Sequence, residues 1–307
     1  MKAVAVQVVL EPVVSIPTTS PYLMEQSILD SETQEPEPKT YAYPTVAESW
    51  GALGWFLLMS LVVGIVAVPL FLHDSPTRRM ITLVSVSELS KVLALVFLLW
   101  KVPAVRRVRL RLLASRELPI VYMLLPVLVL AQLVLRTLVV FLPLPDWTNK
   151  MLTELHQWPV LSFVVVCITA PILEELFFRG LLLSGLLKNY SPRKSIIQSS
   201  LLFGIIHLYP MHAVSAMVLG LFLGWLYYRT QSLGACIVAH SLNNMIGWTL
   251  MQQPPNALNE SKAEMLRQLP PPLQLTLLLL AAAVLFVVAC RRVQQATEPT
   301  KLIESNL

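Results

Sequence analysis

Long apolar runs are the feature that most constrains how this chain can fold. A helix needs about 20 apolar residues to cross a bilayer, because each residue rises about 1.5 Å. Eight runs of roughly this length follow residue 49: 50–72, 82–102, 118–144, 158–187, 195–210, 211–228, 233–251 and 273–290. The fifth is the shortest, and Pro210 separates it from the sixth. We therefore predict an all-α, multi-pass membrane helical bundle with about eight transmembrane helices.

Composition supports the membrane class and excludes nucleic acid as a partner. Only 13% of the 307 residues are charged, against about 25% in soluble domains. The net charge of +5 comes from Lys and Arg beside the apolar runs, without the interleaved aromatic residues of single-strand binders. We therefore expect the lipid bilayer, and no nucleic acid, as a partner.

The chain divides into five parts by composition. Residues 1–49 are rich in Pro, Ser, Thr and Glu and show no helical or strand period, which predicts a disordered or loosely structured N-terminal extension. Three helices are expected over 50–144, a four-helix core over 158–251 and one more helix over 273–290, before a cytoplasmic tail at 291–307.

Basic loops predict the orientation. Lys and Arg gather after the second and fourth segments, in KVPAVRRVRLRLLASRE and KNYSPRK, and after the eighth at Arg291 and Arg292. If the eight segments alternate, these clusters share one side, which should be the cytoplasm. Only Arg78 and Arg79 are discordant. We predict an integral protein of the cell membrane with both termini in the cytoplasm.

The fourth segment contains PILEELFFRGLLL, where three ionisable residues stand in an apolar setting. Glu175 and Arg179 are spaced i to i+4, so on a helix they can form an ion pair that offsets part of the burial cost. Glu174 points about 100° away and is left out of that pair. A carboxylate inside a membrane bundle is suited to proton transfer and needs a partner from another helix.

Two later segments offer such partners. FGIIH places His207 one helical turn beyond Phe203, and HSLNN places His240 and Asn244 on one helix face. Each could be structural, as a hydrogen-bonded His or an Asn that joins two helices. Because isolated polar groups are costly inside a bundle, we expect these residues to meet Glu174.

Other polar residues within the segments have simpler interpretations. Glu88 and Lys91, spaced i to i+3, are interpreted as a neutralised pair, and Arg136 as a snorkelling or hydrogen-bonded arginine.

These motifs resemble the signature of the CPBP family, also called the Abi or CAAX-processing protease family, which are glutamic-type intramembrane proteases. The family pattern is Glu-Glu-x-x-x-Arg, then Phe-x-x-x-His, then His-x-x-x-Asn or Asp, on three membrane helices. All three motifs are present in order between residues 170 and 244, as EELFFR, FGIIH and HSLNN.

The resemblance implies roles for the matching residues. Glu174 and His207 would activate a water for attack on a peptide carbonyl, and His240 and Asn244 would stabilise the oxyanion. Supporting roles fall to Glu175, Arg179 and Phe203. Family members are often described as metalloproteases, and Glu174, His207 and His240 could supply a zinc-ligand set. No HExxH is present, however, so we expect a metal-free mechanism without a cofactor.

The expected function is an intramembrane endopeptidase acting on a membrane-associated protein or peptide. Asn243 stands where the eukaryotic prenyl-protein branch usually has Cys, so the resemblance does not select a prenylated substrate. The main alternative is a catalytically silent scaffold or peptide-immunity protein that uses the same cavity. A proton-coupled transporter is disfavoured because the chain shows no inverted repeat. Oligomeric state leaves no signal in the sequence.

Overall fold

The computed structural model describes residues 42–72, 75–101, 118–144, 158–251, 266–267 and 269–297. All regular elements within these ranges are helical, which confirms the predicted fold class. The first three long helices are α2 (Val46–Leu72), α3 (Pro76–Lys101) and α4 (Leu118–Arg136), the last continued by the 3-10 helix η2 (Thr137–Phe141). The last four are α9 (Pro192–Ile205), α10 (Pro210–Thr230), α11 (Leu233–Met251) and α13 (Pro272–Ala296).

Between these groups lies one continuous helical stretch of changing pitch. It runs through α6 (Pro159–Phe163), η3 (Val164–Thr169), α7 (Ala170–Glu175), η4 (Leu176–Leu183) and α8 (Ser184–Asn189). Both η3 and η4 are π-helical. The predicted fourth segment is therefore one membrane-length element with two wide turns in it.

Six of the described helices are long and apolar enough to cross a membrane: Val46–Pro69, Arg79–Lys101, Pro119–Phe141, Pro159–Asn189, Pro210–Thr230 and Pro272–Ala296. The chain is thus an integral membrane protein. Two of the eight expected segments, α9 and α11, are not among these six. α9 has only 14 residues, and the polar residues His240, Asn243 and Asn244 make α11 less apolar.

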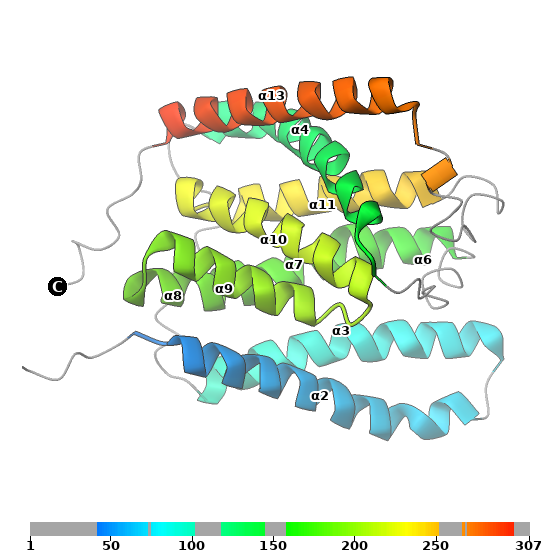
Figure 1. Cartoon of the computed structure of the whole chain (residues 1–307). Coiled ribbons are helices and arrows are strands. Elements are labelled where there is room, and N and C mark those ends of the chain that lie inside the picture. Colours follow the sequence, from blue (N-terminus) through cyan, green and yellow to red (C-terminus); the bar gives the residue numbers. More distant parts are fainter. Residues whose placement is uncertain are drawn as a thin grey trace, which may run out of the picture. The chain divides into compact units, whose positions relative to one another are not determined.

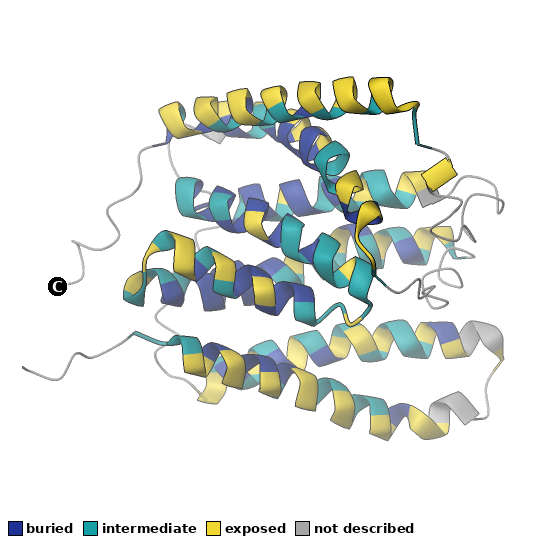
Figure 2. Cartoon of the chain, viewed as in Figure 1, coloured by how far each residue is buried: buried dark blue, intermediate teal, exposed yellow. Residues whose placement is uncertain are grey.

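Neighbouring helices pack in pairs around the most buried elements. α2 packs on α3, α9 on α10 and α4 on α13, while α11 contacts α4, η3 and α7 (Figure 1). Exposed residues concentrate on α2 and α13, whereas α7, α10 and α11 are largely buried or intermediate (Figure 2). The exposed residues of α13 include Leu273, Leu277 and Val284, which suits a helix that faces lipid.

The start of α2 corrects one expected boundary. The helix begins at Val46 rather than at residue 50, because Thr45 and Glu48 form a capping box. The backbone N–H of Glu48 donates to Oγ1 of Thr45 at 3.2 Å, and the N–H of Thr45 donates to Oε2 of Glu48 at 2.7 Å.

The residues before α2 are also held in place. Asn189 at the end of α8 accepts from the Ala42 N–H at 2.9 Å and donates to the carbonyls of Ala42 and Pro44. Burial, with Glu48 beside it, raises the pKa of the Tyr43 phenol to about 12. Residues 42–49 are therefore ordered, in contrast to the loose extension expected there.

Several predicted features fall outside the described residues. These are most of the N-terminal extension (1–41), the basic loop 102–117, the loop 145–157, residues 252–265 and 268 before the last helix, and the end of the tail (298–307). Orientation in the membrane therefore stays a prediction. α13 continues to Ala296, so Arg291 and Arg292 lie in its last turns rather than in a tail.

Candidate active site

The two adjacent glutamates lie between the two π-helical segments. Glu174 and Glu175 end α7, with η3 directly before it and η4 directly after it. Wide turns bond residue i+5 to residue i, as in the N–H of Ala170 to the carbonyl of Val165. Such turns rotate the following side chains relative to a regular helix and occur often at functional sites. Pro171, which has no N–H to donate, stands at the start of α7 and disfavours a regular α-helical ladder there.

Arg179 and Glu175 form the buried centre of the site. Nη1 of Arg179 lies 2.7 Å from Oε1 of Glu175, and both side chains are 0% exposed, which confirms the predicted ion pair. Nη2 of Arg179 donates to the Gly220 carbonyl on α10 at 3.1 Å. The same Oε1 also lies 2.8 Å from Nδ1 of His240 on α11. One carboxylate thus joins three helical elements.

Glu174 faces a different set of partners. Its Oε1 lies 3.5 Å from Nζ of Lys91 on α3, and its Oε2 lies 3.9 Å from Nε2 of His240. The side chain is 11% exposed, unlike that of Glu175. Glu174 is therefore separate from the Glu175–Arg179 pair, as predicted. It also has Lys91 as a cationic neighbour, whereas the sequence predicts only Glu88 as the partner of that lysine.

His207 reaches the site from the turn after α9. Its Nδ1 bonds the Phe203 carbonyl at 2.8 Å, so that nitrogen carries the hydrogen and Nε2 is left as an acceptor. The ring of Phe203 makes edge-to-face contacts with both imidazoles, with its centroid 5.0 Å from that of His207 and 5.7 Å from that of His240. Arg179 covers the same ring at 4.8 Å.

Asn244 lies on the same helix as His240 but makes its described contacts elsewhere. Its Nδ2 donates to the Val166 carbonyl in η3 at 2.9 Å, and its Oδ1 accepts from Nδ2 of Asn243 at 2.9 Å. A carboxamide has two N–H hydrogens, so one remains for another acceptor. The structure thus brings His207 and His240 to the ring of Phe203, with Glu174 beside His240, and ties Asn244 to the π-helical turn.

The contacts of His240 determine what it can do chemically. Because a carboxylate can only accept, Nδ1 must donate its hydrogen to Glu175. With one ring proton, Nε2 and the facing Oε2 of Glu174 are both acceptors, and a water can donate one hydrogen to each. With a second proton, Nε2 becomes a donor. The pair can therefore orient a water and can also hold a negatively charged oxygen.

Glu174, His207 and His240 are the residues that the sequence offers as zinc ligands. Within the described ranges, no three His, Cys, Asp or Glu side chains come together in an arrangement that could hold a metal ion. The ammonium of Lys91 approaches Glu174, and a cation at that carboxylate would be repelled by it. In this arrangement, Glu174, His207 and His240 do not form a three-ligand zinc site.

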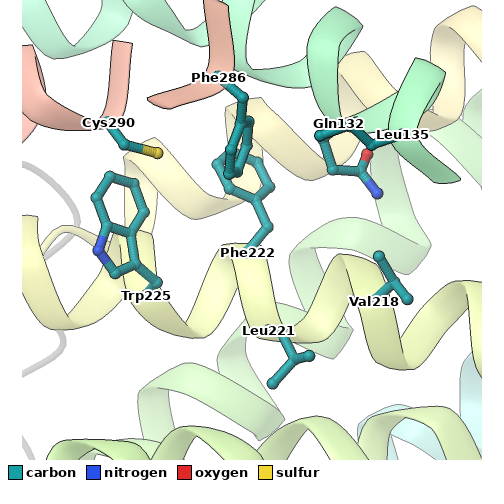
Figure 3. A pocket seen from close by; sticks show the side chains of 8 residues that line it. All are labelled: Gln132, Leu135, Val218, Leu221, Phe222, Trp225, Phe286 and Cys290. Atoms are coloured by element: carbon teal, nitrogen blue, oxygen red, sulfur yellow. The ribbon is translucent and has the colours of Figure 1, made fainter. Parts of the chain in front are cut away.

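A separate apolar cavity lies on another face of α10. It measures about 340 Å³ and is lined by residues of α4, α10 and α13, with Gln132 as its polar member (Figure 3). Gly220, which contacts Arg179, lies on the same helix as the lining residues Val218, Leu221 and Phe222. None of the predicted site residues lines this cavity.

Comparison with known proteins identifies the segment that holds the motifs. Residues 156–246 match the family model described as Rce1-like, type II CAAX prenyl endopeptidase Rce1-like. The resemblance to the CAAX-processing proteases is confirmed. This segment carries all of the predicted site residues, Glu174 and Glu175 through Asn244, but not Lys91.

A curated relative points the same way. The chain is 29% identical over 119 residues to YdiL of Bacillus subtilis (strain 168), which is described as a candidate membrane peptidase. The match covers 38% of this chain and 48% of the relative, so the chain spans about half the length of that protein. No solved structure matches.

Proposed function

We propose that the protein is an intramembrane endopeptidase that hydrolyses peptide bonds of a membrane-associated protein or peptide. The observation that carries the proposal is the arrangement of His240. One ring nitrogen is fixed by the buried Glu175, and the other faces Oε2 of Glu174 at 3.9 Å. A carboxylate that can take a proton from water, beside an imidazole whose Nε2 can donate to a developing oxyanion, supplies the acid–base and electrostatic groups that hydrolysis needs.

In the proposed reaction, Glu174 and His207 activate the water. The water oxygen attacks the peptide carbonyl carbon while its proton passes to Glu174. His240, protonated at Nε2, and the second N–H of Asn244 donate to the oxyanion that forms. Collapse of the tetrahedral intermediate breaks the C–N bond, and the proton held by Glu174 passes to the leaving amine. No cofactor takes part.

Three side chains support this machinery without touching the substrate. The ion pair between Glu175 and Arg179 fixes His240 through Oε1, and Phe203 packs against both imidazoles. Their proposed task is to hold the reacting groups in one geometry, because small displacements of such groups reduce rate strongly.

The test is a cleavage assay with purified protein in detergent, using a membrane-peptide library that includes prenylated and unmodified C-terminal peptides. Glu174→Gln should abolish cleavage and leave insertion and folding intact, and a strong chelator should have no effect on the wild type. Glu48→Gln is the matched control, because it makes the same change at the exposed start of α2 and should cleave normally. Normal cleavage by Glu174→Gln would contradict the mechanism.

Other outcomes distinguish the alternatives. Loss of cleavage on addition of chelator would favour a metal-dependent mechanism. A Glu174→Gln protein that keeps its biological activity in cells would favour the scaffold or peptide-immunity role. Preference within the library would decide between prenylated and unmodified substrates.

A further inference from the structure

Lys91 lies at the proposed catalytic site, although it comes from α3, outside the segment 156–246 that matches the protease family. Its Nζ donates to Oε1 of Glu88 on its own helix at 2.8 Å. The same Nζ lies 3.5 Å from Oε1 of Glu174 on α7. Helix α3 packs against both α7 and η3, so this contact joins the N-terminal helices to the site.

The charges around Glu174 explain why this lysine matters. α3 contributes Glu88 and Lys91, while α7 and η4 contribute Glu174, Glu175 and Arg179. His240 faces Glu174 from α11, and His207 reaches the neighbouring Phe203 ring from the turn after α9. Among these described residues, three carboxylates meet two fixed cations. Arg179 is hydrogen-bonded to Glu175 and to the Gly220 carbonyl. Lys91 is therefore the fixed cation that can neutralise the charge of Glu174.

The two oxygens of Glu174 have separate neighbours. Oε1 is the one that approaches Lys91, and Oε2 is the one that faces His240. A fixed ammonium at Oε1 therefore orients the carboxylate so that Oε2 points to the place where a water would bind. It also favours the ionised form, which a general base must have in an apolar site.

Glu88 and Lys91 do not satisfy each other completely within α3. Oε2 of Glu88 is buried and has no hydrogen-bond partner among the described residues. One oxygen of Glu88 accepts a hydrogen bond from the Lys91 ammonium and so fixes its position. Glu88 also competes with Glu174 for electrostatic attraction to that ammonium.

We infer that Lys91 is a positioning residue of the active site, which holds Glu174 ionised and turns its Oε2 toward the water, while Glu88 moderates this effect. The inference rests on the proposed function. It adds to the proposed machinery a residue that lies outside the three motifs.

The test is the pH dependence of kcat/KM for wild type, Lys91→Gln, Lys91→Arg and Glu88→Gln. Loss of the cation should move the acid limb of Lys91→Gln up by about one to three pH units, because an adjacent opposite charge has an effect of that size. Lys91→Arg keeps the charge and should retain the wild-type acid limb. Glu88→Gln removes a competing negative charge and should move the limb in the opposite direction, to lower pH.

The matched control is Lys101→Gln, which removes the same charge from the same helix at an exposed position near Trp55. Its pH profile should equal that of the wild type. The inference is overturned if Lys91→Gln loses activity without a shift of its acid limb. It is also overturned if folded Lys91→Arg is as impaired as Lys91→Gln. Failure of the proposed function is a separate result, namely a wild type that cleaves nothing or a Glu174→Gln variant that cleaves normally.

Discussion

At the scale of single residues, Arg179 is the side chain on which the buried centre depends most. It is fully buried, pairs with Glu175 and bonds the Gly220 carbonyl. Arg179→Met should lower the free energy of unfolding by about 3 to 5 kcal/mol, because it leaves the Glu175 carboxylate buried without its cation. Thermal unfolding of the purified protein in detergent measures this loss.

The double variant Glu175→Gln with Arg179→Met separates the charge effect from packing. Since it removes both charges, it should regain part of the lost stability. Activity should not return, because Nδ1 of His240 would have lost its carboxylate. Equal stability of the single and double variants would show that the unpaired charge is not the cause.

The site was predictable from sequence where local spacing decides the contact. The i to i+4 spacing of Glu175 and Arg179 predicts their ion pair, and three apolar segments with inward polar groups predict that Glu174 has partners from other helices. The contacts of Lys91 with Glu174 and of His240 with Glu175 were not predictable in this way. Both contacts depend on which helices pack together, and on the π-helical turns that set how α7 is rotated.

At the scale of elements, the close contact of α8 with the residues before α2 is a feature that only the three-dimensional packing shows. A methyl group at Gly185 would overlap Pro44 and the Tyr43 carbonyl, whereas one at Gly64 in α2 would meet nothing within 4 Å. The capping box Thr45-x-x-Glu48 is readable in the sequence and marks the helix start. The bonds from Asn189 to Ala42 and Pro44 span about 145 residues and are not readable there.

Gly185→Ala should therefore release residues 42–44 from α8. The expected result is faster cleavage of the protein near these residues in limited proteolysis, with a lower unfolding temperature. Gly64→Ala is the control and should be neutral or slightly stabilising, because alanine is favoured over glycine in a helix by about 0.5 to 1 kcal/mol. Equal protease sensitivity of the two variants would contradict the contact.

At the scale of the whole molecule, α9 presents the main question about membrane topology. Its 14 residues make it about 21 Å long, shorter than the roughly 30 Å hydrocarbon core. The following turn holds His207 and the left-handed residue Leu208, which has φ of 57° and is 72% exposed. Backbone N–H groups in this turn bond locally, from His207 to Gly204 and from Leu208 to Ile205, as irregular backbone at membrane depth requires.

The basic-loop pattern predicts that α9 crosses, with the loop before it in the cytoplasm and the turn after it on the outer side. Single cysteines at Ser191 and Leu208, in a background without Cys167, Cys236 and Cys290, test this with a membrane-impermeant maleimide. Ser191→Cys should react only from the cytoplasmic side and Leu208→Cys only from the outer side. That result would also indicate that water reaches His207 from outside, because the reagent and the water would share the same aqueous path. Reaction of both from one side, or of Leu208→Cys from neither, would instead make α9 a re-entrant helix and reduce the number of crossings.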